Sequence, residues 1–430
     1  MKFPRFKAPT IGLDVDRGAI KAVQLSQSRE GYTLQHVGYH RLPEGVVIEG
    51  EVADSELLSR ELREFWELHE FKGKSVIIGV SGNNVIVRFV ASPRLSPEDL
   101  KSALGFQAEE HIPMPLEDVV LDHVVLGPSA ENPDDDRVVL VAAHRDLISG
   151  YTEAVRSGGL KPVGVDVKAL SLTRSTLPES LFDDEDTTLL LDIGTEFSNL
   201  VVVQGQSPTH AQLLGIGFGD FITSVAASAD LPEDQTEKLI LDRKVNISPF
   251  IGGLVEPETE LQVTEPLYIP EFEDDEEPAE EVTEGEAAQD SEDQDDYSED
   301  APSEGAGTEL ERTTQEENPQ ENPEGLDPAL AYDVRRGLED AAARLASEVQ
   351  RSIEFHNSRS AAREVSRVFI SGEGALIAGL SDYLEDFMGL PTSLAKPAGR
   401  LVANNSNISD EQLAQMEPVL AVALGLAMEE

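Results

Sequence analysis

Residues 188–204 constrain the fold more than any other stretch, because they predict two buried strands joined by a tight acidic turn. Runs of leucine and valine form the two ends, as in strands that are covered on both faces. In the turn, Gly194 allows the backbone amides to face an anion. Thr195 adds a hydroxyl donor, and Asp192 at the strand end can hold a hydrated metal ion.

A related unit stands about 180 residues earlier in the chain. Residues 11–25 again predict a strand, a turn and a strand, and the turn carries Asp14, Gly18 and Lys21. Two such units indicate a duplicated α/β fold of two domains. A nucleotide cleft between the halves is the site that this duplication favours.

The negative charge of the chain is concentrated in one segment. Residues 256–328 contain 29 acidic residues and one basic residue, Arg312, in a chain of net charge −50. Few apolar residues are present to offset the ordering entropy, so we predict a long disordered acidic loop inserted into a folded domain. A docking arm for a basic partner is the alternative. The remaining residues are also acidic, which argues against nucleic-acid binding.

Composition excludes several other classes. No run of about 18 apolar residues predicts a transmembrane helix, and residues 1–9 predict a short solvated tail rather than a secretory signal. The chain has no cysteine, hence no disulfides or thiolate metal sites, which fits the cytoplasm. His36 and His40 fall on a predicted strand and so do not form a helical metal pair.

Periodicity and turn signals divide the chain into parts. The predicted parts are the tail 1–9, a first domain of residues 10–74 completed by about 168–187, a small inserted α/β domain of residues 75–167, a second domain of residues 188–255 and 329–430, and the acidic insertion 256–328. Within the inserted domain, Ser75–Val80 and residues 85–90 are predicted strands joined by a hairpin-type turn.

The order of these parts resembles the actin-like ATPase superfamily, a duplicated ribonuclease H-like fold. Within it, the sequence is most similar to the PilM family of type IV pilus assembly proteins. The most specific similarity is residues 109–122, EEHIPMPLEDVVLD, which resemble that family's run EAExYIPFPLEEVVLDY. Shorter similarities lie at residues 42–45, 157–162, 348–355 and 423–427. The resemblance covers about residues 10–255 and 329–428.

The resemblance implies a cytoplasmic adaptor that reaches the inner membrane only through its partners. Its actin-like body would bind ATP with magnesium, with little or no turnover. A groove beside the small inserted domain would receive the cytoplasmic tail of a PilN-like membrane protein, with other inner-membrane pilus components as further partners. Two alternatives stay open: an ATP-dependent enzyme of the same superfamily, either an ATPase or a kinase, and an FtsA-like protein that forms filaments.

The nucleotide-binding positions implied by the resemblance lie in turns at strand ends and on two helices. They are Asp14, Arg17, Gly18, Ala19, Lys21, Asp192, Gly194, Thr195, Gly217, Gly219, Glu237, Gly372, Gly374 and Ala375. Asp14 and Asp192 would hold magnesium through water. No residue is implied as catalytic.

The chain departs from the family at several of these turns. Asp16, Phe218 and Glu373 stand where the family has glycine, and Ile240 stands where it has lysine. A side chain in place of glycine obstructs the approach of a ligand to the backbone. Asp16 would also repel a triphosphate, by about 4 kcal/mol for two unit charges about 4 Å apart at an effective dielectric near 20. The alternative to a bound nucleotide is that both turns serve only the duplicated fold.

Overall fold

A computed structural model describes residues 10–129, 132, 134–182, 186–243, 245–247, 326–358 and 363–428. The N-terminal tail and all but the last three residues of the predicted acidic loop lie outside these ranges. The predictions for both segments therefore stay predictions.

Two large sheets share one plan, which confirms the duplicated α/β fold. The first has the order β10-β6-β1-β2-β3-β16 and the second β13-β12-β11-β14-β15. Each sheet contains three consecutive antiparallel strands, β1-β2-β3 in the first and β11-β12-β13 in the second. The first strand of each set also pairs in parallel with a later strand: β1 pairs with β6, and β11 pairs with β14. The first-sheet strands are β1 (Thr10–Val15), β2 (Ala19–Gln27), β3 (Tyr32–Arg41), β6 (Ser75–Val80), β10 (Lys161–Val167) and β16 (Leu401–Asn404). The second-sheet strands are β11 (Thr187–Ile193), β12 (Ser198–Gln204), β13 (Ser207–Leu214), β14 (Val365–Ser371) and β15 (Thr392–Leu394).

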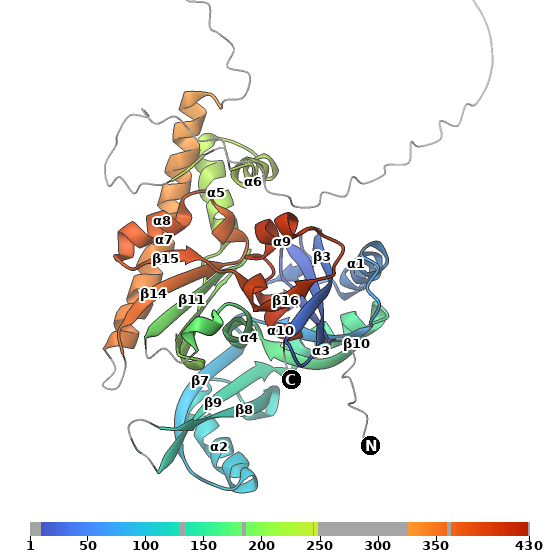
Figure 1. The fold of residues 1–430 in the computed structure, drawn as a ribbon, viewed down its shortest axis with the longest axis vertical. Helices are drawn as coiled ribbons and strands as arrows, with labels where there is room; N and C mark the ends of the chain where they lie inside the picture. The colour runs from blue at the N-terminus through green and yellow to red at the C-terminus, as the bar shows by residue number, and fades with distance from the viewer. Residues whose placement is uncertain are drawn as a thin grey trace, which may run out of the picture. The chain divides into compact units, whose positions relative to one another are not determined.

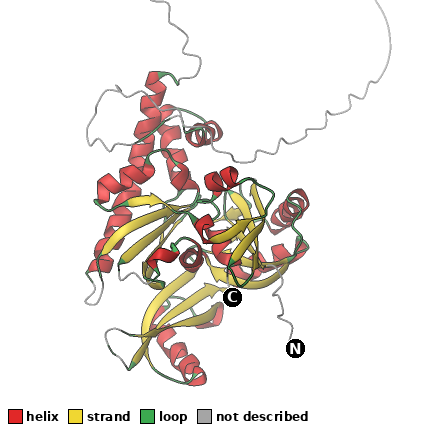
Figure 2. Ribbon diagram, in the orientation of Figure 1, coloured by secondary structure: helices red, strands yellow, loops and turns green. Residues whose placement is uncertain are grey.

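Helices pack against the faces of the sheets (Figure 2). They are α1 (Ser55–Leu68), α2 (Pro97–His111), α3 (Arg145–Ser157), α4 (Lys168–Ser175), α5 (Phe218–Ala229), α6 (Glu233–Leu241), α7 (Pro328–Asn357), α8 (Leu380–Met388), α9 (Asp410–Met416) and α10 (Ala421–Ala427). Local sequence sets several of their starts. Asp54 accepts a hydrogen bond from the amide of Leu57 at the start of α1, and Ser96 does the same for Asp99 at the start of α2.

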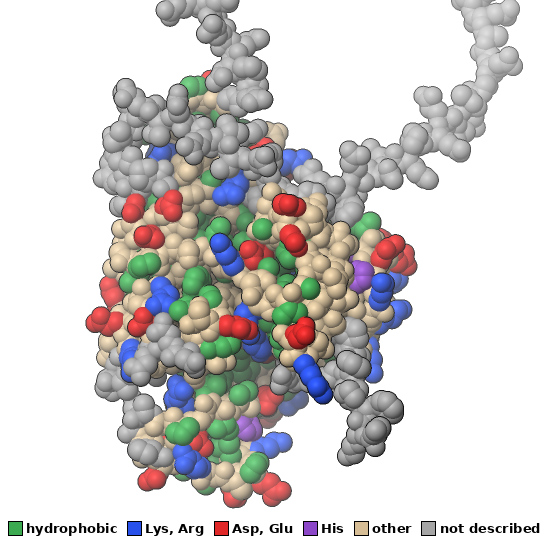
Figure 3. Space-filling model, viewed as in Figure 1, with side chains coloured by type: hydrophobic (Ala, Val, Ile, Leu, Met, Phe, Trp, Pro, Cys, Tyr) green, Lys and Arg blue, Asp and Glu red, His purple; other side chains and the backbone are tan. Residues whose placement is uncertain are grey.

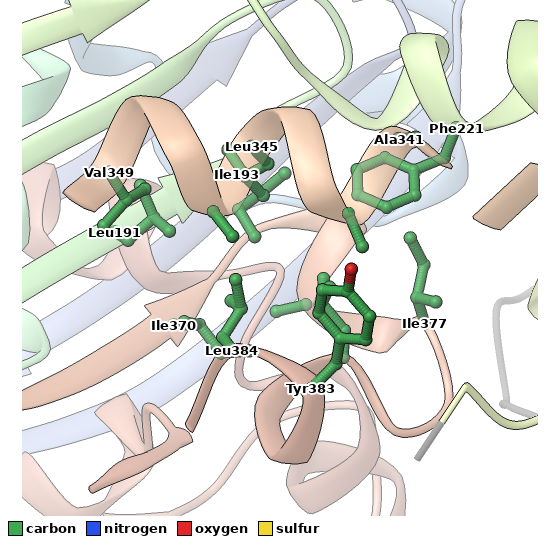
Figure 4. Packing of buried hydrophobic residues seen from close by; sticks show 14 of the residues in the cluster. Leu191, Ile193, Phe221, Ala341, Leu345, Val349, Ile370, Ile377, Tyr383 and Leu384 are labelled. Carbon is green, nitrogen blue, oxygen red and sulfur yellow. The ribbon is translucent and has the colours of Figure 1, made fainter. Parts of the chain in front are cut away.

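The largest core lies in the second half, where α7 crosses the second sheet. Figure 4 shows Val349 and Leu345 of this helix beside Leu191 and Ile193 of β11, with Ala341 one turn further along the helix. All five side chains are fully buried. The apolar residues of α7 recur every three to four positions, so one face of a 30-residue helix is covered along most of its length.

The inserted domain is smaller than we expected. Its three-stranded sheet, in the order β7-β9-β8, consists of β7 (Val85–Pro93), β8 (Val119–Pro128) and β9 (Asp135–His144), with α2 packed beside it. The strand β6 does not form a hairpin with β7, because it pairs in parallel with β1 and β10. Residues 75–80 and 161–167, which we expected in the inserted domain, thus belong to the first sheet. Both strands are parallel to β1, and a parallel pairing requires a long crossover; residues 81–160, inserted domain and α3 included, provide it.

The end of the described chain returns to the first half. We expected residues 329–430 to belong entirely to the second domain, but β16 pairs with β3 and α10 packs on β1, β2 and α4. Every residue of α10 is buried, and the helix lies in the first half together with β16 (Figure 1). Gly12 of β1 allows α10 to lie close to this strand, since a Cβ on Gly12 would stand 2.0 Å from the carbonyl oxygen of Ala423.

Within the described ranges, every helix is either too short or too polar to cross a bilayer. On the face drawn in Figure 3, Lys and Arg are interspersed with Asp and Glu and do not gather in a basic stripe.

Candidate functional site

The two aspartates that we predicted to hold magnesium, Asp14 and Asp192, lie near the ends of equivalent strands in the two sheets. Asp14 pairs with Gly79 across β1 and β6, and Asp192 pairs with Ser371 across β11 and β14. Both aspartates are buried, at 2% and 6% exposure. Asp192 accepts a hydrogen bond of 2.9 Å from the hydroxyl of Ser371. The duplication thus places the two turns at corresponding positions, as their sequences predict.

Asp16 already occupies the amides of the first turn. Its Oδ1 accepts hydrogen bonds from the backbone N–H groups of Gly18, at 3.0 Å, and Ala19, at 3.1 Å. We predicted that these amides face a phosphate. The sequence shows Asp16 in place of a glycine, and the structure shows that its carboxylate lies where an anion would be bound. The side chain of Arg17, the residue between Asp16 and Gly18 in the chain, is exposed.

Lys21 links the first turn to the late turn that follows β14. It lies on β2 at 2% exposure, and its Nζ is 2.8 Å from Asp16 Oδ2, 3.4 Å from Asp14 Oδ2 and 2.5 Å from Glu373 Oε1. A second buried lysine, Lys168 at the start of α4, has its Nζ 2.6 Å from Asp14 Oδ1. The two ammonium groups therefore pair with Asp14, which we predicted to hold magnesium, and Lys21 pairs also with Asp16 and Glu373, which we predicted to obstruct a nucleotide.

Burial and these ion pairs shift several pKa values. Burial would raise the pKa of Asp16, but Lys21 and Lys168 lower it to about 2. Burial would lower the pKa of Lys21, but its carboxylate neighbours hold it well above its usual value. Burial raises the pKa of Glu373 to about 7 and that of Asp192 to about 6. Both shifts have burial as their main cause, because an apolar environment disfavours the charged form of a carboxyl.

The second turn packs against the first residues of α5. The amides of Phe218 and Gly219 donate to the carbonyl oxygens of Gly194 and Thr195, each at 2.8 Å. The amide of Gly194 donates to the carbonyl oxygen of Phe197. A Cβ on Gly217 would stand 2.6 Å from the Gly194 carbonyl oxygen. The glycines that we associated with phosphate therefore let the helix approach the turn.

The late turn closes on the end of β11. Gly372 has φ +84°, and a Cβ there would stand 2.4 Å from the carbonyl oxygen of Ile193. A Cβ on Gly374 would stand 2.3 Å from the Ile193 side chain, and Ala375 is buried in the core of the second half. These three residues, predicted to pass close to adenine, lie against protein.

Glu237 of α6 forms an ion pair with Arg41 at the end of β3, at 2.6 Å. We predicted that Glu237 approaches the ribose or the base. The ion pair joins the two halves at a second place, away from Lys21.

The space between the two turns is small. A cavity of about 30 Å³ is lined by residues that include Asp14, Asp16, Lys168, Asp192 and Thr195. It holds about one water molecule. In the described ranges, no three His, Asp or Glu side chains converge as ligands of a metal ion. The residues present do not fit a triphosphate with magnesium in this arrangement, because the site's own side chains take the amides and the charges.

Sequence reasoning missed Lys168 and Ser371. Each lies beside a predicted carboxylate only because of a strand pairing: β10 reaches β1 through β6, and β14 lies beside β11. A lysine directly after a predicted strand, at residues 161–168, is the signal that could have pointed to the first.

Comparison with known proteins identifies relatives of this fold. The sequence model of the family described as "Type IV pilus assembly protein PilM" matches residues 12–244 and 332–430. Among solved structures, a "PilM-PilN type IV pilus biogenesis complex" matches with a TM-score of 0.71, 22% identity and 97% of each chain covered. The ethanolamine utilization protein EutJ from Carboxydothermus hydrogenoformans matches with a TM-score of 0.50 and 12% identity, over 99% of this chain and 91% of that one. These likenesses confirm the actin-like fold.

Proposed function

Because the chain belongs to the PilM family of type IV pilus assembly proteins, we propose that it is an actin-like adaptor that binds the cytoplasmic tail of a PilN-like membrane protein. The family match carries this proposal, since it spans both halves of the duplicated fold. The likeness to a PilM-PilN complex supports the class of partner. The adaptor then works in the cytoplasm and reaches the inner membrane through that partner.

The inserted domain offers an edge for such a tail. β8 is the last strand of its sheet and pairs only with β9 among the described strands. It exposes three valines, Val120 at 39%, Val124 at 53% and Val125 at 45%. An uncovered strand edge with exposed apolar side chains is a template for an added extended peptide.

The start of β8 is tied to the first half. Nε of Arg145, in the first turn of α3, donates to the carbonyl oxygen of Glu117 at 2.9 Å, and Val119 pairs with His144. Upstream lies the segment with two prolines that resembles the family, residues 112–115, in which Ile112 is buried. A peptide along β8 therefore lies beside the inserted domain, where the resemblance places the groove.

The adaptor role does not require bound ATP or magnesium. An adaptor needs a shaped surface and no chemical step. The amides of the first turn already bind Asp16, and Lys21 already pairs with Asp16 and Glu373. We therefore expect peptide binding in the absence of nucleotide.

Calorimetric titration with a synthetic peptide tests the proposal. The peptide is the N-terminal tail of the PilN-like protein of the same organism, and we expect a Kd of about 1 μM, a binding free energy of about −8 kcal/mol. Val124→Asp should weaken binding about tenfold or more. Val402→Asp is the matched control, because Val402 is an equally exposed strand valine, at 52%, on β16. No binding by the unmodified protein, or equal loss in both variants, would contradict the proposal.

A further inference from the structure

We propose that Asp16, Lys21 and Glu373 form an intramolecular ionic lock that takes the place of a bound phosphate and holds the two halves of the fold together. This inference goes beyond the adaptor role and does not depend on it. It rests on the geometry of the two turns and of the strand β2 between them.

The carboxylate of Asp16 reproduces the contacts of an anion. It accepts two backbone N–H groups of its own turn and the ammonium of Lys21, and the hydroxyl of Thr195 in the second turn lies 3.4 Å from its Oδ1. Successive amides, a lysine and a hydroxyl are the donors with which proteins bind phosphate. A phosphate at this turn must therefore displace Asp16.

The contact between Lys21 and Glu373 joins the halves. Lys21 belongs to the first sheet, whereas Glu373 follows β14 of the second. Both residues are buried, at 2% and 6% exposure, and their charged atoms are 2.5 Å apart. Water screens a buried pair weakly, so separating the halves at this point would leave the carboxylate of Glu373 without its ammonium partner, whereas Lys21 would keep Asp14 and Asp16.

Replacing Asp16 tests whether its carboxylate stands for a phosphate. We compare Asp16→Gly, which frees the two amides and removes the charge, with Asp16→Asn, which removes the charge but keeps an oxygen acceptor. Binding of pyrophosphate and of Mg-ATP is measured by calorimetry, and folding of each variant is checked by circular dichroism. Asp16→Gly should bind pyrophosphate about tenfold or more tightly than Asp16→Asn, with the unmodified protein weakest.

Hydrogen–deuterium exchange tests whether the cluster holds the halves together. Exchange is measured at pH 8, where the carboxyl of Glu373 is ionised, so that Glu373→Gln keeps the shape of the side chain and removes the charge that faces Lys21. Amide exchange in residues 14–21 and 371–377 should become about tenfold faster. Glu339→Gln is the matched control, because Glu339 lies in the same half and pairs with Arg335 on the surface of α7.

The proposal is overturned if Asp16→Gly binds pyrophosphate no more tightly than Asp16→Asn. It is also overturned if Glu373→Gln leaves exchange in both segments unchanged. Should Asp16→Gly fail to fold, the exchange measurement on Glu373→Gln decides alone. Peptide binding is read separately, so failure of the lock and failure of the adaptor role are distinguishable.

Discussion

The proton balance at Glu373 makes the stability of the protein depend on pH. Burial raises the pKa of this carboxyl from 4.5 to about 7, although Lys21 lies 2.5 Å away. The lysine cannot satisfy it fully, because Asp14 and Asp16 share the same ammonium. At slightly acidic pH the folded protein therefore holds a proton that the unfolded chain releases.

The sign and size of the effect follow from linkage. A raised pKa in the folded state stabilises the fold at low pH, and this stabilisation is lost as the pH rises through about 7. With a pKa of 4.5 in the unfolded chain and about 7 in the folded protein, the loss between about pH 5.5 and pH 8 is about 2 kcal/mol.

Glu373→Gln isolates this contribution, because glutamine does not titrate. We would measure urea unfolding by circular dichroism at several pH values and subtract the free energy of unfolding of the variant from that of the unmodified protein. The difference should fall by about 2 kcal/mol from pH 5.5 to pH 8. Glu339→Gln, at a partly exposed surface ion pair, provides the control. Parallel curves for the protein and Glu373→Gln would refute the assignment of a proton to Glu373.

Three further predictions concern packing and the contact at the second ion pair. Phe221→Ala, at a fully buried side chain of the main core, should lower the free energy of unfolding by about 3–5 kcal/mol in the same urea measurement. Gly12→Ala should abolish the native circular dichroism spectrum or the soluble yield, because its Cβ would stand 2.0 Å from the carbonyl oxygen of Ala423; a normal melting curve would contradict this. Arg41→Ala should lower stability by less than about 1 kcal/mol, because its pair with Glu237 is partly exposed, and 1 M salt should remove most of the difference.

The turns and the elements beside them could be predicted from sequence because their signals are local. Asp192 and Gly194 stand between two apolar runs, and a strand, a turn and a strand follow from that pattern alone. The start of α2 at Ser96 follows from a capping serine and a proline at the first helical position.

Strand partners could not be predicted in the same way. β6 is an almost wholly buried apolar strand, and its sequence is the same whether it pairs with β7 in the inserted domain or with β1 in the first sheet. The neighbours of the predicted carboxylates depend on that choice. Lys168 reaches Asp14 only because β10, β6 and β1 are adjacent. The sequence indicated that Asp16 obstructs a ligand, but not that it bonds to the amides of its own turn.

The return of the chain to the first sheet has a consequence for synthesis on the ribosome. β16 completes the edge of that sheet beside β3, and α10 covers β1 and β2, yet residues 401–404 and 421–427 are synthesised long after residues 10–15 of β1. The first half can leave the ribosome only with this surface uncovered. Contacts so distant in sequence form slowly, and exposed strands associate with other chains meanwhile. The first sheet is therefore completed only after residues beyond 400 have emerged.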